Sequence, residues 1–70
     1  DGQLRAPMDG AVIDVLVNEG DTVKKGQTLI IMEAMKIEHQ LKANRDGVVK
    51  ILSTRAKQQL KKRQLLLVIE

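Results

Sequence analysis

Short apolar runs alternate with turn-forming clusters along the whole chain. The predicted strands are rich in β-branched or aliphatic residues, which is typical of half-buried or buried β-structure. They lie at residues 11–17, 22–24, 28–32 and 65–69. The clusters between them contain Gly, Asp and Asn, which accept the backbone conformations of tight turns. The pattern therefore predicts short strands joined by tight turns.

The sequence contains two related halves. When it is shifted by 37 positions, residues 4–12 fall on residues 41–49, and both segments contain an Asp-Gly pair. Other positions also coincide, namely Gln27 with Gln64, Leu29 with Leu66, Ile31 with Val68 and Glu33 with Glu70. Two copies of one unit predict two-fold pseudo-symmetry within one domain, because a solenoid needs about three repeats or more.

The two halves together predict an all-β fold with residues 1–70 as a single domain. We expect eight short strands, four from each half, in two four-stranded antiparallel sheets. These would pack as a flattened barrel or sandwich around one aliphatic core. The chain ends should lie near each other, and the junction of the halves, residues 34–37, should form a hairpin tip at the opposite end. Lys36 lies at that junction.

Residues 53–63 also fit a different element. They contain good helix formers, and Ser53 can cap a helix N-terminus. Their helical apolar spacing, however, stops after one step, from Ala56 to Leu60. The repeat predicts turn–strand–turn here, and we favour it because matches to the first half flank the segment on both sides.

Composition narrows the range of functions. A chain of 70 residues makes one small domain with a thin core, and this one must be aliphatic because Phe, Tyr and Trp are absent. The absence of cysteine excludes disulfides, cysteine-ligated zinc and a thiol nucleophile. No apolar run approaches the ~20 residues of a membrane helix, and no targeting peptide is visible. One histidine and scattered carboxylates form no recognisable metal-ligand set.

Basic residues concentrate in one segment. The net charge is +3, and residues 55–63 contain five basic residues and no acidic one. Three interpretations fit this segment: a solvated surface, a docking site for an acidic face of a larger enzyme, or a nucleic-acid contact. Single-strand binding is disfavoured because bases stack on aromatic side chains, which this chain lacks.

The segment Glu33-Ala34-Met35-Lys36-Ile37-Glu38-His39 resembles the attachment motif of biotin carboxyl carrier domains, in which biotin is joined to the lysine of Ala-Met-Lys-Met. Residues 6–10 and 19–29 resemble the entry turn and the Gly-Asp-x-Val-x-x-Gly-Gln segment of the same family. The resemblance covers nearly the whole chain, and it is most similar to the carrier segment of biotin-dependent acyl-CoA carboxylases.

This resemblance implies a barrel-sandwich hybrid fold with biotin covalently attached to Lys36 by a biotin–protein ligase. The biotin arm would carry carboxylate from a biotin carboxylase site to an acyl-CoA carboxyltransferase site. The domain itself would not be a catalyst, and it would be a piece of a longer carboxylase chain. It further implies a location in the cytoplasm or the mitochondrial matrix, with no membrane and no specific nucleic acid as partner.

The residues around Lys36 are candidates for ligase recognition. Met35 and Ile37 would form an apolar contact patch or simply cap the core. Ala34 would let a partner approach the backbone, and Glu33 and Glu38 would tune the choice of modifying enzyme or act as solubilising charges. His39 fits a solvated strand residue better than a proton carrier, because no acid is placed beside it.

The chain departs from the family pattern at three places. Ile37 replaces the usual methionine and is stiffer. The resemblance implies that other members tolerate a change at this position, so we expect Lys36 still to be modified, at a lower rate. Asn44 replaces a proline in the second half. By the repeat, Lys57, Gln58 and Arg63 stand where the family has Gly, Asp and Gly. Because φ > 0 is strained for Lys and Arg, we expect this turn to have a different shape or to be mobile. It is far from Lys36 in the sequence, so the biotin site should be unaffected.

Three other functions remain as alternatives. A lipoyl carrier shares the architecture, but its lysine usually lies in an Asp-Lys-Ala setting. An unmodified structural domain, as in export-pump adaptors, has no reason to place Met-Lys at the repeat junction. A small basic β-domain that binds nucleic acid would lose binding steeply with salt.

Overall fold

The computed structural model describes residues 2–70 and is built entirely of short strands and turns. Asp1, the first residue of the predicted domain, lies outside the described residues. The eight strands are β1 (Gln3–Arg5), β2 (Gly10–Val15), β3 (Thr22–Val23), β4 (Thr28–Ala34), β5 (Ile37–Lys42), β6 (Gly47–Leu52), β7 (Gln59–Leu60) and β8 (Leu65–Ile69). Within residues 2–70 there is no helix of the length and apolarity needed to cross a membrane.

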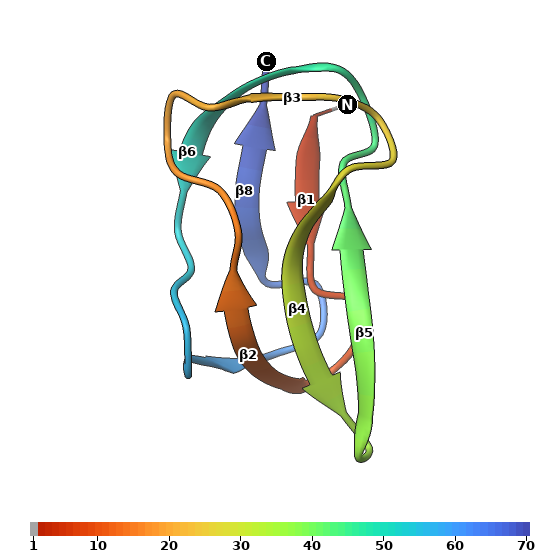
Figure 1. The fold of residues 1–70 in the computed structure, drawn as a ribbon. Helices are drawn as coiled ribbons and strands as arrows, with labels where there is room; N and C mark the ends of the chain where they lie inside the picture. The colour runs from red at the N-terminus through yellow and green to blue at the C-terminus, as the bar shows by residue number, and fades with distance from the viewer. Residues whose placement is uncertain (1) are drawn as a thin grey trace.

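Two four-stranded antiparallel sheets confirm the predicted fold class. The strand order is β1-β8-β6-β3 in one sheet and β5-β4-β2-β7 in the other. Each strand in one sheet has its repeat equivalent at the same position in the other sheet: β1 corresponds to β5, β8 to β4, β6 to β2 and β3 to β7. The two strand orders are therefore the same under the 37-residue repeat. Each sheet contains two strands from each half, and the halves are therefore interleaved (Figure 1).

Hydrogen bonds in the turns obey the same pseudo-symmetry. The backbone N–H of Lys25 donates to Asp46 Oδ1 over 2.7 Å, and that of Lys62, 37 residues later, donates to Asp9 Oδ1 over 2.7 Å. Both bonds join one half to the other. Because each half supplies the carboxylate that holds a turn of its partner, neither half has all its turn contacts alone.

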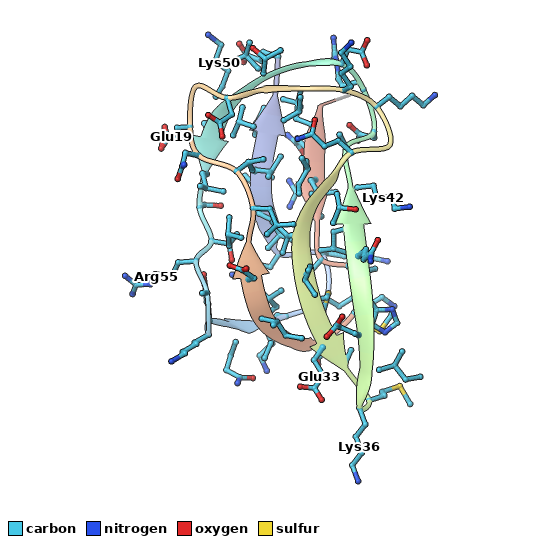
Figure 2. All side chains as sticks on the ribbon, viewed as in Figure 1. Glu19, Glu33, Lys36, Lys42, Lys50 and Arg55 are labelled. Carbon is cyan, nitrogen blue, oxygen red and sulfur yellow. The ribbon has the colours of Figure 1, made fainter. Side chains whose placement is uncertain are left out.

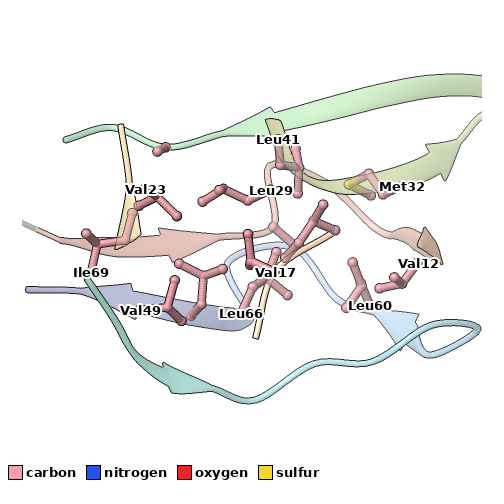
Figure 3. Close-up of a cluster of buried hydrophobic side chains, with 14 of the residues drawn as sticks. Val12, Val17, Val23, Leu29, Met32, Leu41, Val49, Leu60, Leu66 and Ile69 are labelled. Atoms are coloured by element: carbon pink, nitrogen blue, oxygen red, sulfur yellow. The ribbon is translucent and has the colours of Figure 1, made fainter. Parts of the chain in front are cut away.

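One aliphatic core lies between the sheets (Figure 3). Strand side chains mostly alternate between the core and solvent, and register shifts in β4 and β8 place adjacent residues in the core, as at Leu29–Ile30 and Leu66–Leu67. Burial of each large aliphatic side chain contributes about 1.5–3 kcal/mol. The largest fully buried side chains are Leu29, Ile30, Met32, Leu66, Leu67, Ile69, Val23 and Val49. Leu29 and Leu66 are repeat equivalents, so both halves contribute matched residues to the core.

The two chain ends lie at one end of the molecule and the β4–β5 hairpin tip at the other (Figure 1). This arrangement confirms the prediction that residues 34–37 form a tip opposite the termini. The tip is the point where the first half passes into the second, and its pseudo-symmetric counterpart is the pair of chain ends.

The turns of the second half have the same shape as those of the first, which corrects the expectation of a different shape for this segment. Lys57 and Arg63 have φ of 70° and 71°, beside 93° and 89° for their equivalents Gly20 and Gly26. Residues 59–60 form strand β7 as the repeat predicted, and the helical alternative for this segment is wrong.

A side-chain network accounts for the preserved turn. Gln58 Oε1 accepts hydrogen bonds from the Thr54 hydroxyl over 3.0 Å and from the backbone N–H of Arg55 over 3.1 Å. In the first half, Asp21 Oδ2 accepts the equivalent bond from the backbone N–H of Asn18 over 2.8 Å. Gln58 therefore replaces Asp21 as the acceptor, and it also satisfies the buried hydroxyl of Thr54.

Candidate functional site

The hairpin tip is a two-residue turn. Ala34 and Ile37 are the last pair of the β4–β5 ladder, so Met35 and Lys36 alone form the connection. Their φ values are 53° and 65°. Positive φ at both central residues is the signature of a type I′ hairpin, which normally favours Asn-Gly. Here two long side chains occupy left-handed positions at a cost of roughly 1–2 kcal/mol each.

Lys36 projects away from the body of the domain at this tip (Figure 2). It is exposed, as are its neighbours Met35 and Ile37, with 87% and 60% of their surfaces accessible. The paired strands hold the backbone in place while the amine extends into solvent. The site therefore presents one amine between two accessible apolar side chains, as the sequence indicated.

Ala34 faces the core, with 3% of its surface exposed. A Cβ built on Gly10 of the neighbouring strand would stand 3.1 Å from the Cβ of Ala34, and it would also contact the carbonyl oxygen of Glu33. The small size of Ala34 thus serves close packing between β4 and β2. The expectation that a small residue at this position lets a partner approach the backbone stays a prediction.

Glu33 and Glu38 are directly paired across β4 and β5, one step before the tip. Both are exposed. Like charges in this position are destabilising, since directly opposite Cβ atoms lie about 4.5–5.5 Å apart. The hairpin therefore places a pair of carboxylates beside Lys36. His39 is half-buried opposite Met32, and none of the hydrogen bonds resolved among residues 2–70 ties it to an acid.

Strand β7 and the cations beside it lie in the half of the molecule that carries the hairpin, although they are remote from Lys36 in the sequence, whereas Arg55 lies at mid-height (Figure 2). Strand β2 lies between β4 and β7, and Ala11 pairs with Glu33 on one side and with Gln59 on the other. Strand β7 is therefore one strand away from the hairpin, with β2 between them. The expectation that the altered turn is far from Lys36 holds along the chain and not in space.

Sequence reasoning missed this proximity because strand order, and not sequence distance, decides which turns share an end. The interleaving could have been inferred from the repeat. If the halves exchange strands, then β7, the short strand of the second half, must join the sheet that contains β4, the first-half strand of the hairpin.

The described residues present an amine without enclosing a substrate. Residues 2–70 form no pocket, and among them no three His, Asp or Glu side chains gather where they could hold a metal ion. An exposed primary amine on a rigid turn is suited to acylation by an incoming enzyme.

The family model for biotin-requiring enzymes, which covers biotin- and lipoyl-carrying domains, matches residues 2–69. The mitochondrial methylcrotonoyl-CoA carboxylase subunit alpha of Dictyostelium discoideum is 51% identical over 51 residues, which are 73% of this chain and 7% of that protein. The biotin carboxyl carrier protein of Streptococcus mutans is 50% identical over 46 residues, which are 66% of this chain and 35% of that protein. The chain thus spans a small part of these relatives.

Two solved structures contain a domain with a fold similar to that of this chain. One is a single-chain, multi-domain long-chain acyl-CoA carboxylase, with a TM-score of 0.88 and 32% identity over 97% of this chain and 7% of that chain. The other is the lipoyl domain of the 2-oxoglutarate dehydrogenase complex of Azotobacter vinelandii, with a TM-score of 0.86 and 21% identity over 100% of this chain and 96% of that domain. The second likeness concerns the fold alone.

Proposed function

Because this chain belongs to the family of biotin- and lipoyl-carrying domains, we propose that Lys36 is the residue to which biotin is attached. The observation that carries this assignment is the position of Lys36. It is the second of two exposed residues in the turn at the free end of the domain, and it lies between the accessible side chains of Met35 and Ile37. The chain is a biotin carrier domain, and the position of its attachment lysine is what the proposal adds.

The attachment step requires little of the carrier itself. The Lys36 nitrogen attacks the acyl carbon of biotinyl-adenylate on a biotin–protein ligase. The new bond is an amide, the acyl–phosphate bond breaks, AMP leaves, and the amine loses its proton. The ligase must take up the proton that the nitrogen releases as the amide forms. The domain supplies a fixed backbone and an accessible nitrogen.

The attached group acts as a mobile arm in the proposed whole protein. When bound, biotin accepts a carboxyl group and releases it again, a chemistry that protein side chains do not supply. We propose that the domain, as one segment of a longer carboxylase, brings Lys36 in turn to a biotin carboxylase site and to an acyl-CoA carboxyltransferase site. The rigid hairpin lets Lys36 enter such sites ahead of the rest of the domain.

Four neighbours of Lys36 would contact the ligase. Met35 and Ile37 offer apolar surface on both sides of the amine, and methionine adapts readily to a partner surface. Glu33 and Glu38 offer a paired negative charge that a cationic group on the ligase can bind. Ala34 acts through its small size, which lets β4 pack closely against β2 and so fixes the tip.

A location in the cytoplasm or the mitochondrial matrix would fit this role. Methylcrotonoyl-CoA carboxylase subunits alpha similar to this chain are named as mitochondrial, and the chain also resembles a bacterial carrier protein.

The test is an intact mass measurement after incubation with a biotin–protein ligase, biotin and ATP. We expect one added biotinoyl group, absent from Lys36→Arg and retained in Lys42→Arg, which changes an exposed lysine at the other end of β5. Circular dichroism should show all three proteins folded alike. A parallel reaction with a lipoate ligase covers the lipoyl alternative: a lipoyl adduct without a biotinoyl adduct would contradict the proposal.

A further inference from the structure

We propose that strand β7 and its flanking turns form an electrostatic docking surface for an acidic patch on the biotin–protein ligase. The basic surface consists of Lys57, Lys61, Lys62 and Arg63, all exposed. The inference rests on the proposed attachment of biotin at Lys36. It adds a second contact region, away from the hairpin, that sets how the ligase approaches.

The location of the basic surface is the first support. Gln59 of β7 pairs with Ala11 of β2, and Ala11 pairs with Glu33 of the hairpin. The turn that follows β7 is fixed to the same end of the molecule, because the backbone N–H of Lys62 donates to Asp9 Oδ1 just before β2. An enzyme that receives Lys36 in its active site therefore has its rim near these cations.

Backbone strain is the second, independent support. Lys57 and Arg63 adopt φ of 70° and 71°, although their equivalents at the opposite end are Gly20 and Gly26. A Cβ at either glycine would meet nothing within 4 Å, so the turn positions open onto solvent. Side chains in this conformation are strained, and strain of this kind concentrates at functional sites. Both strained turn positions that flank β7 carry a cation.

Charge distribution is the third support. Five of the 12 basic residues and none of the nine acidic residues lie in residues 55–63, so the rest of the chain has a net charge of −2. Glu33 and Glu38 form a negative pair on the hairpin, separated from β7 by β2 alone. The Lys36 end is therefore bipolar. A partner with complementary positive and negative patches can bind this end in only one orientation about the axis of the Lys36 side chain. The hairpin tip without the charged surfaces would not specify that orientation.

The ligase is the partner that gains most from such a surface. Carboxylase sites within the same chain or complex meet the carrier at a high effective concentration through their tether. A ligase must find the domain by diffusion, and complementary charge raises the rate of that encounter by about 10-fold or more. A nucleic acid fits less well, because the carboxylate pair at the same end would repel phosphates and the chain has no aromatic residue on which bases could stack.

The repeat supplies a matched control for the test. Lys61→Glu/Lys62→Glu reverses two charges beside β7, and Lys24→Glu/Lys25→Glu makes the same change at the equivalent positions beside β3, at the terminal end (Figure 1). Both pairs change the net charge equally. In each pair the backbone N–H of the second lysine donates to an equivalent aspartate, Asp46 for Lys25 and Asp9 for Lys62. We would measure kcat/KM for biotinylation by the organism's own ligase across a range of salt concentrations.

We expect Lys61→Glu/Lys62→Glu to lower kcat/KM about 10-fold at low salt and the Lys24→Glu/Lys25→Glu control to lower it less than about 2-fold. The difference should shrink as salt rises, since the screening length falls to about 10 Å at 0.1 M. A second variant, Lys57→Gly/Arg63→Gly, removes two charges and relieves backbone strain. A fall in kcat/KM for this variant, with stability unchanged or raised, excludes misfolding as the cause.

Four results would overturn the docking surface. Equal losses in the two Lys→Glu pairs would assign the effect to net charge, and no loss in either would leave the basic surface without a role at the ligase. Unchanged biotinylation together with binding to a DNA duplex that Lys61→Glu/Lys62→Glu abolishes would assign the surface to nucleic acid. A parent chain that takes up no biotin at all would contradict the proposed function itself, and the docking surface with it.

Discussion

Replacing Lys57 and Arg63 by glycine should stabilise the domain. Both residues hold left-handed backbone conformations with φ of 70° and 71°, and both side chains are exposed. Neither side chain donates any of the hydrogen bonds resolved among residues 2–70. Their contacts come from the backbone: the N–H groups donate to the carbonyl oxygens of Val12 and Ala6, and the carbonyl oxygen of Arg63 accepts from the Arg5 guanidinium. Glycine keeps those backbone bonds, so the substitution changes the conformational term with little else.

The size of the effect follows from two opposing terms. A left-handed conformation costs an L-residue roughly 1–2 kcal/mol. Glycine relieves this cost but loses more backbone freedom on folding, and this entropy loss offsets about 0.5–1 kcal/mol of the gain in stability. At the midpoints of these ranges the net gain is about 0.75 kcal/mol for each site. The two sites lie in different turns and should add, giving about 1–2 kcal/mol for the double variant.

Urea and thermal unfolding of the parent, both single variants and the double variant would measure this gain. A change of 1 kcal/mol shifts Tm by about 4–8 °C in a domain of this size. The reciprocal control is Gly20→Lys/Gly26→Arg, which puts the same side chains at equivalent open positions and should destabilise by a similar amount. A double glycine variant no more stable than the parent would refute the reasoning that these turns are strained.

Further substitutions test the packing and the turn network. Gln58→Ala should cost about 1–3 kcal/mol in urea unfolding, because the buried Thr54 hydroxyl loses its acceptor; the added change Thr54→Val, which restores the valine of the equivalent position 17, should recover part of that loss. Gly10→Ala should cost about 1–3 kcal/mol or more by the same measurement, since its methyl group would contact the carbonyl oxygen of Glu33, and an unchanged midpoint would contradict the close approach. Leu66→Ala should cost about 2–5 kcal/mol, as should Leu29→Ala, and a large difference between them would argue against equivalent core positions.

The sequence contained most of the fold because the fold repeats itself. The 37-residue shift identified equivalent strands, and the Asp-Gly pairs marked their starts, so eight strands, two sheets and the opposite placement of the tip and the termini could be predicted. What could not be predicted was the shape of the turn at residues 53–64. The absence of glycine argued for a changed turn, whereas the Gln58 network and the backbone bonds to the first half keep the original shape.

The candidate site was predictable in its centre and less so in its surroundings. The position of Lys36 at the junction of the halves followed from the repeat. The inward direction of Ala34 depends on strand phase, and the nearness of β7 to the hairpin depends on which sheet each short strand joins. Both are properties of the paired structure, and neither can be inferred from the local sequence of the Ala-Met-Lys segment.

The most direct test of the central claim is a peptide map of the protein purified from its own cells. Trypsin does not cleave after an acylated lysine, so biotin on Lys36 predicts a peptide of residues 26–42 that is heavier by one biotinoyl group, with the fragment spectrum locating the added mass on Lys36. Separate unmodified peptides of residues 26–36 and 37–42 from biotin-replete cells, or a lipoyl group on Lys36, would contradict the account.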